Sequence, residues 1–284
     1  DRIRRRFGEI VRKLSLTQGT SKVTRDIFPV FDALLPGDAS EKVCVWVRDG
    51  WSIDENSVRA DARQAGNQSP TVFVFIPKRS ADDLRHYLID FKAASATLDK
   101  RGVPNTAEGT EARSAMETTK QTAEGKIREL LQEAFSGARV FQGGGNEILG
   151  TDLQEMALEA ATNALQRLYP QFHIADHTGW PKVYEKAQKG APDALKSVGD
   201  DGEPAKNPVC KAILAFIAGG KKGIDVRKHF EGATYGWPGD AVDGGLQVLL
   251  VAGLIRALDD KGQTIDPKDL ERKAIGKTMF KVES

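Results

Sequence analysis

Two short apolar runs separated by one polar stretch constrain the fold of this chain more than any other feature. Residues 43–48 (VCVWVR) and 71–76 (TVFVFI) are apolar almost throughout, which is typical of strands buried on both faces of a sheet. The stretch between them predicts a helix with a capping box of Ser52 and Glu55 at its start and Gly66 at its end. Because a strand, a helix and a strand in this order require a crossover, we expect the two strands to be parallel.

Two long antiparallel helices are predicted next, over residues 81–100 and 107–136. Apolar residues in the first follow a 4-3-4-3 spacing, residues 102–104 (GVP) break it, and a capping box at Asn105 opens the second. A third strand is expected at residues 139–142. We therefore expect one largely parallel sheet of three strands with a helical hairpin inserted in it.

The C-terminal part predicts three helices followed by a β-hairpin. Apolar spacing indicates helices over residues 208–218, 224–230 and 238–258. Residues 259–262 (DDKG) have the composition of a hairpin turn, and residues 279–282 alternate as a last strand. This is the element order of a winged helix.

The predicted fold class is α+β and mostly helical: a small α/β layer with an antiparallel helical hairpin, a helical connector and a C-terminal winged helix. A polar, turn-rich stretch supports a boundary before the last part. The predicted divisions are a helical lead-in (1–36), the α/β layer (37–150) with its hairpin (81–136), a helical connector and linker (151–204, with the turn-rich stretch at 191–207) and the winged helix (205–284).

Charge is distributed unevenly along the chain. The net charge is +4 over residues 1–36, −6 over residues 37–204 and +3 over residues 205–284. A basic C-terminal part favours contact with DNA, although an excess of this size is also found on ordinary solvated surfaces. The candidate DNA-binding residues are Lys221, Lys222, Arg227, Lys228 and Lys261.

The helix expected to enter a DNA groove argues against base reading. Its first turns contain Asp240 and Asp243 and no Lys or Arg. Two carboxylates at a groove lined with phosphates would be repelled, so we expect binding without sequence preference, or a protein partner at these carboxylates.

Arg48, Asp49 and Trp51 follow the first buried strand and form a second candidate site. Open α/β sheets bind ligands at the carboxyl ends of their strands, so we consider this edge for a ligand or partner. The alternative is that Asp49 caps a tight turn and Trp51 packs in the core.

Motifs for metal, nucleotide and nucleophile chemistry are incomplete. His173 and His177 have the spacing of two zinc ligands on a helix, but no third ligand is near, and a capping or packing role is favoured. The glycines of residues 145–150 are spaced as in a phosphate-binding loop, but Thr151 and Asp152 replace the required Lys and Ser/Thr. We expect no catalytic residue, no metal site and no cofactor in this chain.

Composition excludes a membrane span, because no apolar run approaches the ~18–20 residues required. Two cysteines, Cys44 and Cys210, are far apart and are expected to be buried thiols of a cytoplasmic protein. The sequence begins with Asp1 and shows no signal peptide, so we expect part of a longer chain.

Five segments of residues 40–284 resemble, in the same order, the BREX phage-defence P-loop ATPase family of the BrxC/PglY type. The resemblance implies a downstream fragment, without the P-loop, of a large cytoplasmic bacterial ATPase. It further implies ATP and Mg²⁺ at a nucleotide site outside this sequence, other BREX proteins including a methyltransferase as partners, and a possible homo-oligomer through the ATPase part. The segments are residues 45–51 (VWVRDGW), 80–85 (SADDLR), 98–104 (LDKRGVP), 140–147 (VFQGGGNE) and 235–238 (YGWP).

Residues and resemblance together predict a non-catalytic region that serves assembly with other BREX proteins and sequence-independent DNA contact. The alternative is a free-standing DNA-binding regulator built on the winged helix. A nucleotide hydrolase is the third hypothesis, and the incomplete phosphate-binding loop argues against it.

Overall fold

The computed structural model describes residues 1–99 and 104–283, which form two compact units. Unit 1 comprises residues 1–14, 28–36 and 44–161. Unit 2 comprises residues 15–27 and 37–43 together with the described residues from Thr162 onward. The fold class is α+β and mostly helical, as predicted.

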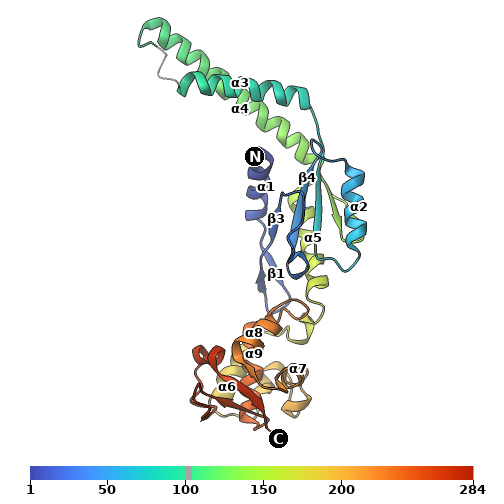
Figure 1. The fold of residues 1–284 in the computed structure, drawn as a ribbon, viewed down its shortest axis with the longest axis vertical. Coiled ribbons are helices and arrows are strands. Elements are labelled where there is room, and N and C mark those ends of the chain that lie inside the picture. The colour runs from blue at the N-terminus through green and yellow to red at the C-terminus, as the bar shows by residue number, and fades with distance from the viewer. Residues whose placement is uncertain (100–103, 284) are drawn as a thin grey trace. The chain divides into compact units, whose positions relative to one another are not determined.

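Unit 1 is built on one five-stranded sheet of order β3-β4-β5-β6-β7 (Figure 1). Strands β3, β4 and β5 are parallel, so the predicted parallel pair is confirmed. The three strands predicted in this region share the sheet. The strand bounds are β3 (Phe28–Val30), β4 (Cys44–Asp49), β5 (Val72–Ile76), β6 (Arg139–Gln142) and β7 (Glu147–Ile148).

Strand β6 runs antiparallel to β5, and β7 antiparallel to β6, so the expectation of a largely parallel sheet was wrong. Between β5 and β6 the helices α3 (Ala81–Asp99) and α4 (Ala107–Ser136) form the predicted antiparallel hairpin (Figure 1). Two helices of opposite direction return the chain to the end of the sheet that it left, so the next strand must run in reverse. Residue 100 of the first predicted helix, and residues 102 and 103 of the predicted break, lie outside the described residues.

Both faces of the sheet in unit 1 are covered. Trp46 and Phe73 pack with residues of α2 (Glu55–Ala65) on one face, while their neighbours Val45 and Val74 are buried on the other. The apolar character of residues 43–48 and 71–76 follows from this double burial.

Helices α2 and α4 begin one or two residues later than their predicted caps: Asp54 and Thr106 cap them, not Ser52 and Asn105. Asp152 caps the helix that begins at Leu153. Each of the three capping side chains accepts a hydrogen bond from the backbone N–H three residues on, at 2.9, 3.1 and 2.9 Å respectively. At two of the three starts the residue that caps is a carboxylate, which the helix dipole favours over a neighbouring hydroxyl.

Residues 1–36 are not a helical lead-in, which corrects the prediction. Helix α1 (Arg2–Arg12) is followed by a hairpin of β1 (Leu16–Gln18) and β2 (Val23–Arg25), which belongs to unit 2, and then by β3 of unit 1. The apolar spacing suggested a second helix, but Gly19 at φ +68° closes a turn and β-branched residues occupy the strands after it.

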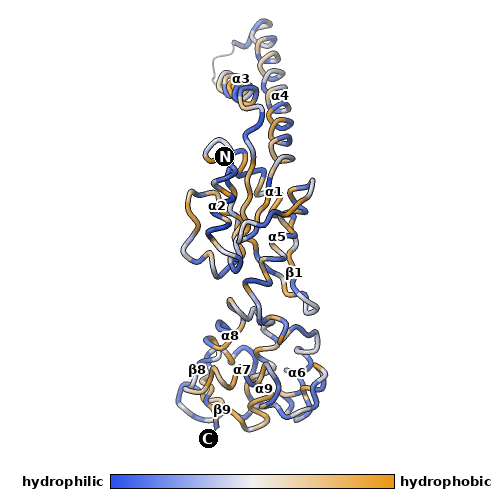
Figure 2. The backbone as a smooth tube through the Cα atoms, turned by 90° about the vertical axis from the view of Figure 1, so that its right-hand side faces the viewer, coloured by the Kyte–Doolittle hydropathy of each residue, from blue (hydrophilic) through white to orange (hydrophobic). Residues whose placement is uncertain are grey.

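Unit 2 is organised around helix α9 (Gly239–Val251), on which α6, α7 and α8 pack (Figure 2). The helix is shorter than the predicted residues 238–258. Gly253 at φ +67° follows its end and allows the chain to enter β9. The remaining helices with residues in unit 2 are α5 (Leu153–Leu168, shared with unit 1), α6 (Trp180–Gln188), α7 (Pro208–Ile217) and α8 (Gly223–Glu231).

The sheet of unit 2 is antiparallel and has the order β10-β9-β11-β8. The order of helices and strands from α7 to β11 is the predicted one, with the short strand β8 added between the first two helices. The bounds are β8 (Lys221–Lys222), β9 (Ile255–Leu258), β10 (Thr264–Ile265) and β11 (Met279–Val282).

The boundary between the compact units lies within α5, between Ala161 and Thr162, and not in the predicted residues 191–207. Those residues form short 3-10 turns inside unit 2, where Ala194 and Leu195 are buried. The polar composition of residues 191–207 reflects turns at the surface of unit 2 and not a linker between units. The 3-10 turns of the chain are η1 (Ala39–Glu41), η2 (Phe172–Ile174), η3 (Ala194–Val198), η4 (Pro204–Lys206) and η5 (Arg272–Lys277).

Within the described ranges, no helix combines the length and the apolar character needed to cross a membrane.

Candidate functional site

Helix α9 is the helix that the sequence analysis expected to enter a DNA groove, yet it is enclosed. Every residue from Ala241 to Leu250 is buried. A Cβ atom added at Gly244 would lie 3.2 Å from Trp180 of α6, and one added at Gly245 would lie 2.6 Å from Ile213 of α7. The two glycines let α6 and α7 approach α9 from both sides. The side chains of residues 241–250 are therefore not exposed at the surface of unit 2.

Asp243, at the start of α9, lies in an internal ion pair. Its side chain is only 3 % exposed. It accepts hydrogen bonds from Arg227 at 2.8 and 3.1 Å and from Arg272 at 2.8 Å. Arg272 also pairs with Asp240.

This arrangement changes two sequence predictions. Arg227 and Asp243 bind each other, so Arg227 is not available for phosphate and Asp243 is not available for a partner. The carboxylates of Asp240 and Asp243 are also neutralised, which removes the predicted repulsion of phosphate. Charge at the start of α9 therefore no longer argues against base reading, whereas residues 241–250 are buried.

A cationic sheet face is formed by Lys222, Arg256 and Lys281. Lys281 pairs across the strands with Arg256, one residue beyond the buried pair of Phe280 and Ala257. Because successive strand residues point to opposite faces, Lys281 and Arg256 point away from the core. Lys222 pairs with Met279, two residues from Lys281, and is on the same outer face.

The charges on the cationic sheet face are mostly uncompensated. Arg256 has an exposed ion pair with Glu283 at 3.9 Å. Lys222 and Lys281 are exposed, and neither has an ion pair with any carboxylate in the described chain. A surface of this kind binds phosphates without distinguishing bases.

The other predicted cations do not join this face. Lys221 pairs with the buried Phe280 and lies over the ring of Phe216 at 5.3 Å, on the inner side of the sheet. The pKa of His229 is lowered mainly by burial of its imidazole, and the positive charge of Lys221 lowers it further. Lys228 is exposed on α8 and Lys261 on the turn between β9 and β10.

Arg256 and Lys281 were missed by the sequence analysis. The signal was present, because Ile255-Arg256-Ala257 and Phe280-Lys281 alternate apolar and basic residues. Only the cross-strand register brings the two cations together.

Asp49 at the end of β4 caps a turn, as the alternative interpretation predicted. It accepts hydrogen bonds from the N–H of Trp51 at 3.0 Å and from the hydroxyl of Ser52 at 3.2 Å. Arg48 lies over the ring of Trp46 at 4.7 Å and pairs with Asp61 at 3.6 Å. The side chains of Arg48 and Asp49 therefore both interact with other residues of unit 1.

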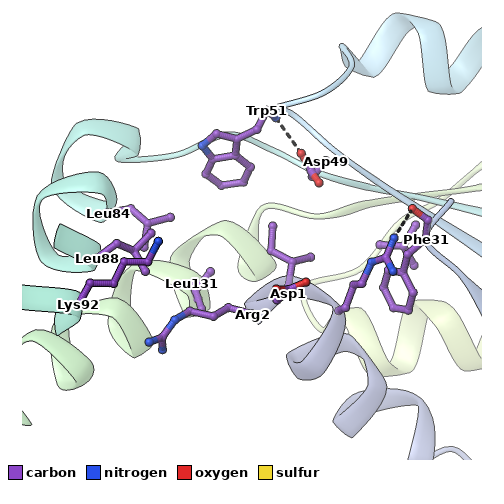
Figure 3. Close-up of a pocket in the computed structure, with 12 residues that line it drawn as sticks. Asp1, Arg2, Phe31, Asp49, Trp51, Leu84, Leu88, Lys92 and Leu131 are labelled. Carbon is purple, nitrogen blue, oxygen red and sulfur yellow. Dashed lines mark hydrogen bonds between the residues drawn. The ribbon is translucent and has the colours of Figure 1, made fainter. Parts of the chain in front are cut away.

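Trp51 does not pack in the core and is 38 % exposed. Figure 3 shows its ring facing a cavity that is also lined by Leu84, Leu88 and Lys92 of α3 and by the start of α1. The cavity has a volume of about 540 Å³. A second cavity of about 470 Å³ shares Trp51 and the α3 residues. We call the two together the α3 groove.

The remaining motifs have structural roles. His177 Nδ1 accepts the N–H of Gly179 at 2.9 Å, and His173 Nδ1 lies 3.0 Å from the carbonyl of Pro170. Asp152 caps α5, and Gly145 at φ +86° closes the turn between β6 and β7. No cluster with metal-ligand character occurs in residues 1–99 and 104–283.

Both cysteines are buried, and neither forms a disulfide bond. Burial raises the pKa of the Cys210 thiol to about 12. This thiol is protonated at neutral pH and is a poor nucleophile.

Comparison of the chain with protein-family models, curated proteins and solved structures gives no significant match.

Proposed function

We propose that this chain is a non-catalytic interaction region of a BREX-type phage-defence ATPase of the bacterial cytoplasm, and that unit 2 holds nucleic-acid backbones without reading their sequence. The observation that carries the nucleic-acid part is the cationic sheet face of Lys222, Arg256 and Lys281, beside an α9 that is enclosed. The five segments of residues 40–284 support the family part.

The chemistry of the cationic sheet face suits phosphate. Arg and Lys side chains give contacts that fix position on a nucleic acid, and base edges have to be reached by an exposed element in a groove. In a winged helix that element is the third helix, and here it is α9. We interpret residues from α7 to β11 as a winged helix whose reading helix serves as the core of the unit.

Salt dependence tests the nucleic-acid proposal. The affinity of the full chain for a random DNA duplex is measured from low to moderate salt. Three phosphate contacts give a slope of about −2.7 in log K against log salt, at about −0.9 for each contact. The variant Lys222→Glu plus Lys281→Glu lowers the magnitude of that slope by about 2.

The matched control is Lys182→Glu plus Lys186→Glu on α6. Both lysines are exposed in unit 2 on a helix that packs on α9, and the net charge changes by the same amount. The proposal requires that this control keep the wild-type slope. Equal slopes in the two variants contradict it. A single duplex bound more than ~10³-fold tighter than random DNA supports the free-standing regulator instead.

The family part is tested by co-purification. We expect the chain, or the longer protein that contains it, to co-elute with other BREX proteins including the methyltransferase. We also expect no saturable binding of a fluorescent ATP analogue with Mg²⁺ to this chain, because the resemblance implies that the nucleotide site of the family lies outside this sequence. Micromolar binding that is lost on replacing Gly145 or Gly150 contradicts this part.

A further inference from the structure

The α3 groove of unit 1 combines an apolar floor with exposed apolar anchors. Leu84 is buried at its base and Leu88 half-buried beside it. Trp51 and Ile89, which line it, are 38 % and 57 % exposed. Exposed large apolar side chains gathered at one concave surface mark an interaction site more often than isolated ones do.

The backbone of Trp51 is held in a hydrogen-bonded turn at the edge of this groove. The N–H of Gly50 donates to the carbonyl of Ile76 at 2.9 Å, and Asp49 accepts the N–H of Trp51 itself. A Cβ atom added at Gly50 would lie 2.5 Å from the backbone nitrogen of Lys78, so the turn is pressed against the end of β5. Because the backbone is already ordered, a partner that binds the ring pays only for ordering the side chain.

The rim of the groove is basic. Lys78, Arg85 and Lys92 line it and are exposed, and none of the three has an ion pair within the part of the chain that the structure describes. Asp82 lines the second cavity, and Asp1 and Asp49 line the first, where Asp49 accepts hydrogen bonds within its own turn. Arg2 and Arg4 also line the first cavity, so basic side chains outnumber carboxylates around the groove. An acidic partner would gain from these charges, and a basic one would lose.

The dimensions suit a short helix. The groove follows α3 from Ala81 to Lys92, which is about 16 Å at about 1.5 Å per residue, or roughly three turns. Leu84 and Leu88 are spaced one turn apart along it. An amphipathic helix that lies in such a groove places apolar anchors at i, i+3 or i+4 and i+7.

We propose that the α3 groove binds an amphipathic segment of a partner protein, with apolar anchors on one face and acidic residues beside them. Trp51 and Ile89 pack against the anchors, and Lys78, Arg85 and Lys92 pair with the carboxylates. The inference concerns unit 1 alone and is independent of nucleic-acid binding by unit 2. It names a surface for the predicted role in assembly and the chemical character of the partner that would bind there.

The chain contains its own reporter for this test. Trp46, Trp180 and Trp237 are buried, so acrylamide quenches chiefly Trp51. The probe is a synthetic 12-residue peptide of about three turns, with Leu at i, i+3, i+7 and glutamates between, and without aromatic residues. We expect saturable protection of Trp51 from acrylamide by this peptide. The comparison peptide has lysine in place of every glutamate, and we expect it to protect at least tenfold less well.

Charge reversal on the rim provides the decisive variant. In Lys78→Glu plus Lys92→Glu, we expect the acidic peptide to bind at least tenfold more weakly and the basic peptide to bind more tightly. Ile89→Glu should weaken both. All these side chains are exposed, and unchanged emission of the buried tryptophans verifies folding. The Lys182→Glu plus Lys186→Glu variant, with the same net charge, should bind both peptides like wild type.

Several results overturn the proposal. One is the absence of saturable protection up to about 1 mM acidic peptide, which leaves less than about 4 kcal/mol of binding. Another is equal binding of acidic and basic peptides. Protection of Trp51 by DNA, or by raising the concentration of the chain alone, would assign the groove to a nucleic acid or to a second copy. None of these results bears on the salt slope of the cationic sheet face.

Discussion

At the scale of single residues, Asp243 of unit 2 is a buried carboxylate that accepts hydrogen bonds from two arginines, Arg227 and Arg272. Removing its carboxylate in Asp243→Ala leaves Arg227 without its ion-pair partner and leaves Arg272 with Asp240 alone. We expect a loss of about 1.5–3 kcal/mol of unfolding free energy, because the buried carboxylate and its charge-assisted hydrogen bonds are lost while the two arginines stay partly exposed. Urea unfolding followed by tryptophan fluorescence measures this loss.

The control is Asp240→Ala, which removes the more exposed carboxylate that pairs with Arg272. We expect it to cost less than about 1 kcal/mol, as is usual for pairs near the surface. Similar losses in the two variants would mean that burial of Asp243 does not set the energy of this network.

Asp176 predicts a pH dependence of unit 2. It accepts hydrogen bonds from the N–H and hydroxyl of Ser21 at 2.8 and 2.6 Å and from the N–H of Thr20 at 2.9 Å. Burial acts to raise the pKa of Asp176, but these bonds outweigh it and the pKa is lowered. Ionised Asp176 therefore stabilises the fold above its unfolded pKa of about 3.9, and this contribution is lost as the pH falls through the lower folded value.

Thermal unfolding of wild type and Asp176→Asn at several pH values tests this prediction. The wild type should exceed the variant in stability near pH 6, and the difference should shrink as the pH falls below about 4. Asp193→Asn, which removes an exposed pair with Lys196, should behave like wild type throughout. A difference between Asp176→Asn and wild type that stays constant with pH would contradict the assignment.

At the scale of elements, sequence patterns predicted most helices and strands but not their ends or partners. Residues 43–48 and 71–76 were identified because double burial makes a strand apolar throughout. Residues 15–30 were misread, because short strands and a helix give similar apolar spacing when a turn glycine such as Gly19 interrupts them. The caps were displaced by one or two residues, since several hydroxyl, amide and carboxylate side chains compete at each helix start.

Gly245 of α9 is a position where we expect alanine to destabilise the chain, although alanine has the higher helix propensity. Replacing a helical glycine by alanine normally stabilises a helix by about 1 kcal/mol. In Gly245→Ala the new methyl group would lie 2.6 Å from Ile213, which is itself fully buried. We expect a net loss of about 1–3 kcal/mol from overpacking, measured by urea unfolding.

Gly125→Ala in α4 is the matched variant, because nothing lies within 4 Å of its added Cβ atom. It should be neutral or stabilising by up to about 1 kcal/mol. If both variants stabilise the chain, the contact of α7 with α9 is looser than described.

At the scale of the whole molecule, composition along the chain did not reveal how it divides into units. Unit 2 gathers residues 15–27, 37–43 and those from Thr162 onward, so its core depends on contacts between distant segments. For the same reason the sequence identified Lys222 but not its neighbours Arg256 and Lys281. It identified Trp51 but not the groove that α3 forms beside it. A local pattern indicates what a residue can do, and the long-range contacts decide with which others it does so.

The division of the chain predicts that residues 205–284 do not form a stable winged helix on their own. Their central helix, α9, would lose Trp180 and Val183 of α6, and Trp237 would lose the hydrogen bond from its Nε1 to the carbonyl of Gln171, at 2.9 Å. The isolated segment should expose apolar surface, bind a hydrophobic dye and unfold without a cooperative transition. The longer segment 162–284 keeps α6 and should unfold cooperatively. It should be less stable than the full chain, because it lacks the hairpin that Asp176 holds. Cooperative unfolding of residues 205–284, at the stability of the longer segment, would show that α9 does not need the cover of α6. That result would reopen sequence reading by α9, which its enclosure now argues against.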